Sequence, residues 1–210
     1  ELQTGSSFQS ARRKAQLNFK EVAQSSARRA VALLGSRKMP GRRCSVIFDP
    51  WVAGEILDLV SGLLCADQVQ RGMSLLGGRL GQPVTSELVT LVDEPRRPAA
   101  LASSVYDDEG FPTAAKTMVE KGVLRDYFYD SYTAAKAKRP NNACAERSSH
   151  KGLPSPGSSN FFMSPQNKSQ EQIIADTGAG ILVFEIIGMH TADPVSGEFS
   201  VGVSGLAIEQ

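Results

Sequence analysis

Apolar residues recur at intervals of three and four along two stretches in the first third of the chain. Within residues 17–34 the repeating positions are Phe19, Ala23, Ala27, Ala30 and Leu34. Within residues 50–65 they are Val52, Ile56, Leu59, Val60 and Leu63. This spacing predicts two amphipathic helices, the second preceded by Asp49 as N-cap with Pro50 in its first turn. A third helix is predicted over residues 169–177, where Ser169 and Gln172 form a capping box.

Short runs of β-prone residues lie between and after these helices. Ser45–Phe48 is one such run, and residues 84–92 alternate loosely between apolar and polar side chains. Ile181–Ile187 reads as a buried strand, and alternation from Phe199 onward predicts a final one. These patterns predict at least four strands.

A tight turn is predicted at Lys121-Gly122, because glycine tolerates the positive φ that such a turn requires. Met118-Val119 and Val123-Leu124 flank it, which favours a β-hairpin. A helix over residues 114–121, ended by Gly122, is the alternative. With the hairpin, the fold class is α+β, mainly antiparallel sheet in the C-terminal half, with helices near residues 17–34, 50–65 and 169–177.

The composition of one stretch is typical of a loop. Residues 139–160 consist largely of Pro, Asn, Ser and Gly with few apolar side chains, which predicts a long loop or a partly disordered segment. The preceding residues 131–138 are rich in alanine and are expected to be helical.

The overall composition is that of a soluble globular protein: 210 residues, 41% apolar and 21% charged. The longest uninterrupted apolar run is Ile181–Phe184, far below the roughly 20 residues of a spanning helix. The N-terminus shows no secretion signal, so we expect a cytoplasmic protein without a membrane partner. Three widely spaced cysteines, Cys44, Cys65 and Cys144, are expected to be reduced thiols.

Charge is unevenly distributed along the chain. Residues 1–43 contain ten lysines and arginines against two glutamates, a balance of +8, whereas the whole chain has a net charge of +1. A nucleic-acid surface is one interpretation. Phe19 fits the apolar face of the predicted helix and does not form an aromatic pattern between the charges, so we interpret the segment as a solvated helix face and expect no nucleic-acid partner.

Two groups of residues are candidates for a functional site. Asp107-Asp108-Glu109, followed by Gly110, is either a hard-cation site or a turn whose carboxylates accept backbone N–H groups; we favour the turn. His190 follows a predicted strand and precedes Asp193, Gly197 and Glu198. We interpret it as a polar loop residue, with a role as ligand or acid–base group as the alternative. The Gly-rich segments lack the residues of a phosphate-binding or dinucleotide-binding loop.

Three separated, turn-rich phrases follow one another in a distinctive order. They are Asp107–Thr113, then Glu120–Leu124 leading into Asp130–Ala134, and finally Gly188–Ser200. In this order they resemble the C-terminal half of the TldD/PmbA family, formerly named modulator of DNA gyrase. Ser74–Gly81 and Val92–Pro95 are similar to that family as well.

The resemblance implies a link to proteolysis in the cytosol. The family comprises zinc metallopeptidase subunits and non-catalytic partners, and no His-Glu-x-x-x-His zinc motif occurs in this chain, which points to the partner (PmbA, also called TldE) branch. Residues 1–43 would then be a basic helical segment joining a missing N-terminal domain, and residues 44–210 a C-terminal domain truncated at its end. A departure is Pro140–Cys144, where family members usually have a Thr-Gly-Asn-like phrase.

The resemblance therefore predicts a non-catalytic partner subunit of a zinc metallopeptidase complex that degrades or processes unfolded or small peptides. Zinc is expected on a TldD-like partner, and no catalytic, cofactor or metal residue is transferred to this chain. Asp107, Asp108, Glu109, Gly110, His190, Asp193 and Gly197 are predicted to form loops near a cavity. The alternatives are a hydrolase active on its own through an atypical site and a homodimeric binding or scaffold protein.

Overall fold

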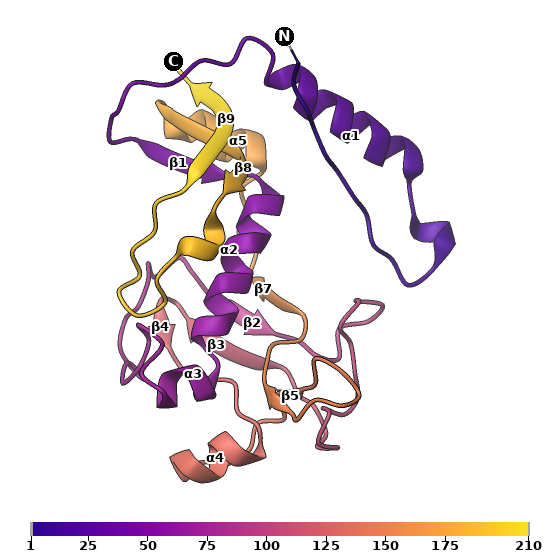
Figure 1. Ribbon diagram of the computed structural model, residues 1–210, viewed down its shortest axis with the longest axis vertical. Coiled ribbons are helices and arrows are strands. Elements are labelled where there is room, and N and C mark those ends of the chain that lie inside the picture. The colour runs from indigo at the N-terminus through magenta and orange to yellow at the C-terminus, as the bar shows by residue number, and fades with distance from the viewer. Residues whose placement is uncertain (1, 210) are drawn as a thin grey trace. The chain divides into compact units, whose positions relative to one another are not determined.

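The structure, a computed structural model, describes residues 2–209 and divides into two compact units (Figure 1). The first unit consists of residues 2–55, 166–192 and 199–209. The second consists of Ile56–Pro165 together with the short segment Asp193–Glu198. The fold is α+β, as the sequence predicts.

The first unit contains a three-stranded sheet in the order β1-β8-β9, formed by Ser45–Phe48, Gly180–Ile187 and Gly202–Ile208. Strand β8 pairs antiparallel with β9, and parallel with β1. The strand prediction at Ile181–Ile187 is confirmed, although full burial within it is confined to Gly180, Leu182 and Val183. The final strand begins at Gly202 rather than at Phe199.

The helices of the first unit follow local capping signals. Helix α1, Phe19–Ala32, is capped by the Asn18 side chain, which accepts the Glu21 N–H. The short 3-10 helix η1, Lys14–Gln16, precedes it, and helix α5, Gln170–Thr177, begins with the predicted capping box. Helix α2, Pro50–Leu63, starts in this unit with Asp49 Oδ1 accepting the Trp51 N–H.

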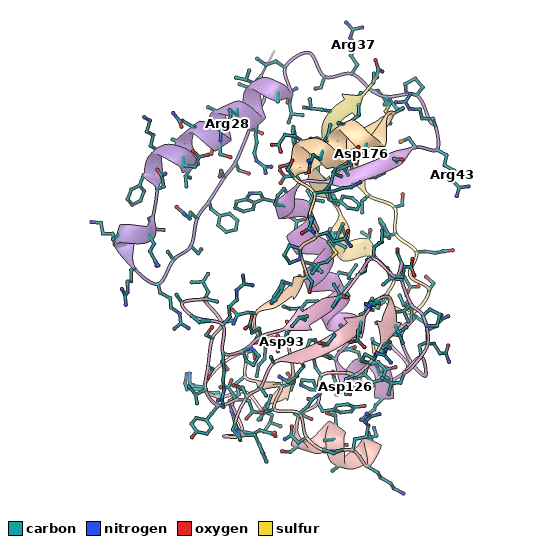
Figure 2. The ribbon with its side chains drawn as sticks, turned by 180° about the vertical axis from the view of Figure 1, so that it is seen from behind. Arg28, Arg37, Arg43, Asp93, Asp126 and Asp176 are labelled. Atoms are coloured by element: carbon teal, nitrogen blue, oxygen red, sulfur yellow. The ribbon has the colours of Figure 1, made fainter. Side chains whose placement is uncertain are left out.

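The predicted apolar stripe of α1 is not its covered face. Phe19 and Leu34 are 66% and 52% exposed, whereas Leu33 is buried. The covered face is fixed instead by Arg29, whose Nη2 lies 2.6 Å from Asp49 Oδ1 and whose Nη1 donates to the Phe184 carbonyl. The basic side chains Arg28, Arg37 and Arg43 are exposed, in agreement with a solvated segment (Figure 2).

The second unit is built around a four-stranded sheet in the order β4-β3-β2-β7. Its strands are Val123–Leu124, Lys116–Glu120, Leu91–Asp93 and Phe161–Met163, and neighbouring strands are antiparallel. The end of α2 and the helices α3, Ala66–Gln70, and α4, Ser131–Ala137, belong to the same unit. The core is centred on Leu64, Met118, Leu124 and Phe128, each with no exposed surface.

The predicted hairpin is present as β3 and β4. Lys121 and Gly122 both have positive φ, 45° and 79°, as a two-residue turn requires, so the helical alternative is wrong. Residues 84–90, by contrast, are irregular with one turn at Glu87-Leu88, and only Leu91–Asp93 is a strand. The Val84 N–H donates to the Gly122 carbonyl, and the Gly122 N–H donates to Val89, which holds this segment against the hairpin.

The loop predicted at residues 139–160 contains a small two-stranded sheet. Strand β5, Ala145–Glu146, pairs antiparallel with β6, Ser155–Pro156. The Cys144 N–H donates to Tyr129, and the Gly157 N–H donates to Cys144, so both ends of the excursion are tied to the unit. Among the described residues, no helix is long and apolar enough to cross a membrane.

Candidate functional site

A cavity of about 190 Å³ lies in the second unit. Its walls come from the end of β2, the segment between residues 102 and 108, strand β5 with the two residues before it, and residues 157–159. Residues from all four segments line it, among them Asp93, Ser104, Glu146 and Ser159. The cavity therefore depends on segments far apart in the sequence.

Asp93, at the end of strand β2, is the most buried carboxylate in the lining of this cavity and is labelled in Figure 2. Its side chain is 2% exposed, and its Oδ2 lies 3.5 Å from Nζ of Lys116, which is 11% exposed. Its Oδ1 accepts the backbone N–H and the hydroxyl of Ser159, at 2.7 and 2.9 Å. A carboxylate with these partners ties β2 and β3 to the segment after β6.

The acidic turn lies at the same cavity and holds neighbouring segments by hydrogen bonds. Asp107 Oδ1 accepts the N–H groups of Glu109 and Phe111, and its Oδ2 accepts that of Ala145, at 3.2 Å. Asp108 Oδ2 accepts the N–H of Arg147, at 2.7 Å. These contacts match the turn interpretation, in which the carboxylates accept backbone N–H groups.

The third carboxylate of the turn faces the start of α4. Glu109 Oε2 accepts both the backbone N–H and the hydroxyl of Ser131, at 2.8 and 2.7 Å. Asp130 forms a capping box with Thr133 at the same end of the helix. Gly110, with φ of 84°, adopts the left-handed conformation that this turn requires. The three acidic side chains thus connect their own turn to residues 145–147 and to the start of α4.

Two ionisable groups in the cavity wall have raised pKa values. Burial raises the pKa of the Cys144 thiol to about 12, and the Lys116 ammonium opposes that shift. Burial also raises the pKa of the Glu146 carboxyl, with further contributions from Asp108 and Asp58. The thiol is therefore neutral at physiological pH and is a poor nucleophile.

The predicted loop residues near the end of the chain lie in two different units. His190 belongs to the 3-10 helix η2, Met189–Thr191, in the first unit, where it is exposed. Asp193 and Gly197 belong to the second unit, where Asp193 Oδ1 accepts the N–H groups of Val195 and Ser196. These bonds lower the pKa of the Asp193 carboxyl.

The turn at Asp193–Glu198 packs on the Gly-rich segment of the second unit. The Leu75 N–H donates to the Pro194 carbonyl, and a Cβ added at Gly197 would lie 3.1 Å from the Leu75 side chain. Pro194 also lines a second cavity of about 280 Å³, together with Leu63, Cys65 and Met73. Burial raises the pKa of the Cys65 thiol to about 12 as well.

The donor residues do not fit a zinc ion. Among residues 2–209, no group of three or more His, Cys, Asp or Glu side chains is arranged to hold a metal. The two histidines, His150 and His190, belong to different units. A structural or catalytic zinc site in proteins needs at least three such ligands.

Sequence reasoning missed the residues that define the cavity. Asp93 is part of the Val92–Pro95 phrase, but nothing local indicates its contact with Ser159, 66 positions away. Cys144 and Glu146 lie in a stretch that reads as a loop. Their only local signal is the apolar run Ala143–Ala145 within that polar stretch.

The family model described as the PmbA/TldA metallopeptidase C-terminal domain matches residues 40–210. The chain belongs to the TldD/PmbA family. It is 33% identical to a protein of Methanocaldococcus jannaschii named as a metalloprotease, over 79% of this chain and 37% of that protein. It is 27% identical to the metalloprotease PmbA of Escherichia coli O157:H7, over 87% of this chain and 38% of that protein. The resemblance predicted from the ordered phrases is thus confirmed.

Solved structures of the TldD/PmbA family have the same fold. A Thermotoga maritima protein described as a candidate modulator of a DNA gyrase superposes with a TM-score of 0.87 at 30% identity, covering 95% of this chain and 45% of that one. TldE from Thermococcus kodakarensis superposes with a TM-score of 0.82 at 23% identity, over 94% of this chain and 45% of that one, which shows a shared fold. The chain thus spans less than half the length of these relatives.

Proposed function

We propose that this chain is the C-terminal part of a non-catalytic subunit in a TldD/TldE-type zinc metallopeptidase complex. Family membership supports a link to peptide hydrolysis, because the relatives are named metalloproteases. The non-catalytic role is supported mainly by the metal-ligating residues. The sequence has no His-Glu-x-x-x-His motif, and within residues 2–209 no three His, Cys, Asp or Glu side chains are grouped to hold a metal ion. The zinc ion would be held by a TldD-like partner.

The role of this chain would be to bind and orient extended peptides. Each main sheet has edge strands: β1 and β9 in the first unit, and β4 and β7 in the second. An edge strand presents backbone N–H and C=O groups that an extended peptide can pair with. Strand β9 offers seven residues, Gly202–Ile208, which is enough for several consecutive backbone hydrogen bonds. Most extended segments of a folded protein are already paired within its own sheets, so unfolded and small peptides are the expected substrates.

The test uses the full-length protein, alone and mixed with a paralogue that has the His-Glu-x-x-x-His motif. Zinc content and cleavage of an unfolded peptide are measured in each sample. We expect stoichiometric zinc and cleavage in the mixture only. Cleavage with bound zinc by this protein alone would refute the non-catalytic role, and no association with the paralogue would favour a homodimeric scaffold instead.

Two matched variants, one in each protein, separate the partner's contribution to peptide cleavage from that of this chain. Substituting the first histidine of the paralogue's zinc motif should abolish cleavage while the two proteins still associate. His190→Ala in this chain should leave cleavage unchanged, because His190 is exposed and has no second donor arranged with it among the described residues. A loss of cleavage in His190→Ala would contradict the proposal.

A further inference from the structure

Helix α1 and the turn that follows it have an apolar face that is exposed along its whole length. Phe19, Ala23, Ala27, Val31 and Leu34 are all exposed, and the three larger side chains are 66%, 65% and 52% exposed. Successive members are three or four positions apart, so they lie in one row along the helix. We call this row the α1 ridge.

Other sides of α1 hold the helix to its unit. Arg29 pairs with Asp49 and donates to the Phe184 carbonyl. A Cβ added at Gly5 would lie 2.3 Å from the Ser26 carbonyl oxygen, so the extended N-terminal segment passes directly against the helix there (Figure 1). The α1 ridge takes part in neither contact, which leaves it open to another surface.

These contacts give α1 little of the packing that a helix of its length needs. It has 14 residues, and none of them, all within the described part of the chain, is buried. Isolated helices of this length are marginal in water, and most helices in proteins are stabilised by packing of an apolar face. The α1 ridge is such a face, and a surface that covers it would supply the packing.

The surroundings of the α1 ridge are strongly basic. Residues 1–43 contain ten lysines and arginines and two glutamates, and one of these, Glu21, pairs with Arg28 at 2.7 Å. Nine of the ten basic side chains are exposed: Arg12, Arg13, Lys14, Lys20, Arg28, Arg37, Lys38, Arg42 and Arg43. They lie on α1 and on the segments before and after it, so a surface that covers the ridge meets a positive potential.

We propose that the α1 ridge is a docking surface for an acidic amphipathic helix of a partner protein. Apolar residues of the partner pack along the ridge, and its carboxylates pair with Lys20 and with the basic side chains beyond the two ends of α1. This interaction goes beyond the function proposed above, because it needs neither zinc nor a peptide substrate.

The side chains of the ridge favour a helix over a lipid surface. The middle positions, Ala23 and Ala27, let another helix approach closely, and residues four apart form the ridges that pack into the grooves of a neighbouring helix. A bilayer gains little from two alanine methyl groups, because the free energy of insertion scales with the apolar area that is buried.

Charge distinguishes the remaining partners. A second copy of this chain would bring together two basic segments, each with a balance of +8, and like charges at an interface repel. A nucleic acid would match the charge, but its phosphates gain nothing from Phe19, Val31 and Leu34. An acidic helix with its own apolar row matches both properties of the ridge.

The test uses the full-length protein and three synthetic peptides of about 18 residues. The first has a row of leucine and alanine at four-residue spacing, flanked by glutamates. The second has the same row flanked by lysines, and the third has the composition of the first in an order without the row. Binding is followed by the fluorescence anisotropy of a label on each peptide.

We expect the acidic amphipathic peptide to bind at least about tenfold more tightly than either of the others. Raising the salt concentration from about 0.05 to about 0.5 M should weaken its binding at least about fivefold, because exposed charges are screened. Equal binding of the acidic and basic peptides, or binding of none, would overturn the proposal.

Two variants with the same change in charge locate the binding surface. Ala27→Glu places a carboxylate in the middle of the ridge and should weaken binding of the acidic peptide at least about tenfold. Gln24→Glu adds the same charge on the exposed surface of α1 outside the ridge and should change binding by no more than about threefold. If circular dichroism shows a loss of helix in Ala27→Glu, Ala27→Gln, which adds bulk without charge, takes its place. Equal binding by the folded ridge variant and Gln24→Glu would refute the assignment.

The other partners are outcomes of the same experiment. Binding to phosphatidylserine-containing vesicles, binding to double-stranded DNA and self-association in sedimentation are compared between the parent protein and Ala27→Glu. Any of these that Ala27→Glu abolishes, without a preference for the acidic peptide, would assign the ridge to that partner and overturn the proposal. None of these measurements involves zinc or peptide cleavage, so they stand apart from the test of the partner-subunit role.

Discussion

The buried pair of Asp93 and Lys116 gives the most direct test of what holds the second unit together. Removing the carboxylate in Asp93→Ala leaves the Lys116 ammonium, 11% exposed, without its counter-charge. It also leaves the N–H and hydroxyl of Ser159 without their acceptor. Removing one partner of a buried ion pair lowers the free energy of unfolding by about 3–5 kcal/mol, because the remaining charge stays desolvated.

The expected readout is local hydrogen exchange in the full-length protein. A loss of about 3–5 kcal/mol corresponds to roughly 100- to 4,000-fold faster exchange, since each 1.4 kcal/mol is tenfold. The effect should appear at the amides of β2, β3 and β7, which Asp93 connects to the segment after β6. The double variant Asp93→Ala with Lys116→Met should recover part of this loss, because it removes the unpaired charge.

An exposed ion pair in the same sheet provides the control. Arg125 and Glu120 lie 2.9 Å apart with side chains 49% and 54% exposed, so Glu120→Gln should change exchange by no more than about fivefold. If Asp93→Ala changes exchange as little as Glu120→Gln does, the buried pair is not structural. A double variant that exchanges as fast as Asp93→Ala would show that the unpaired ammonium is not the cause.

Four further predictions concern other residues. Arg29→Lys should destabilise the docking of α1 by about 2–4 kcal/mol, because one lysine ammonium cannot keep both the ion pair with Asp49 and the hydrogen bond to the Phe184 carbonyl. Hydrogen exchange of the helix amides should become faster, and unchanged exchange would contradict the prediction. Gly122→Ala should cost at least about 1–3 kcal/mol in denaturant unfolding, since φ is 79° and a Cβ would lie 2.6 Å from a carbonyl oxygen; an unchanged midpoint would refute this. Iodoacetamide at pH 8 should alkylate the half-buried Cys44 and spare Cys144, whose pKa is about 12. Because the folded-state pKa of Cys144 is raised above 9.0, its contribution to stability should be complete below pH 9 and be lost as the pH rises toward 12.

Local signals made the regular elements predictable. The capping box at Ser169, the N-cap at Asp49 and the turn glycine at position 122 each act within four residues, so the sequence alone indicates them. The alternation at residues 84–90 was misleading because a tertiary contact decided the outcome. That segment bonds to the β3–β4 turn as an irregular stretch, not as a strand in the sheet.

Contacts between distant residues could not be predicted in the same way. Strand β1 pairs in parallel with β8, although the paired residues, such as Ser45 and Gly180, are 135 positions apart in the chain. The covered face of α1 is fixed by Arg29, which pairs with Asp49. Because Arg29 is charged, the pattern of apolar and polar positions along the helix places it on the solvent side instead. The cavity likewise depends on four separated segments, and only the acidic turn among them carries a distinctive sequence pattern.

The hydrogen bonds in the cavity wall distinguish the carboxylates that hold the fold together from one that does not. Asp107 accepts three backbone N–H groups, so Asp107→Ala should cost about 1.5–3 kcal/mol in denaturant unfolding. Glu146 has no such partner within residues 2–209, and Glu146→Gln should lie within about 0.5 kcal/mol of the parent protein. Glu146 is exposed, so its carboxylate is hydrated and the fold does not depend on it. A marked loss of stability in Glu146→Gln would remove this distinction and return Glu146 to the structural group.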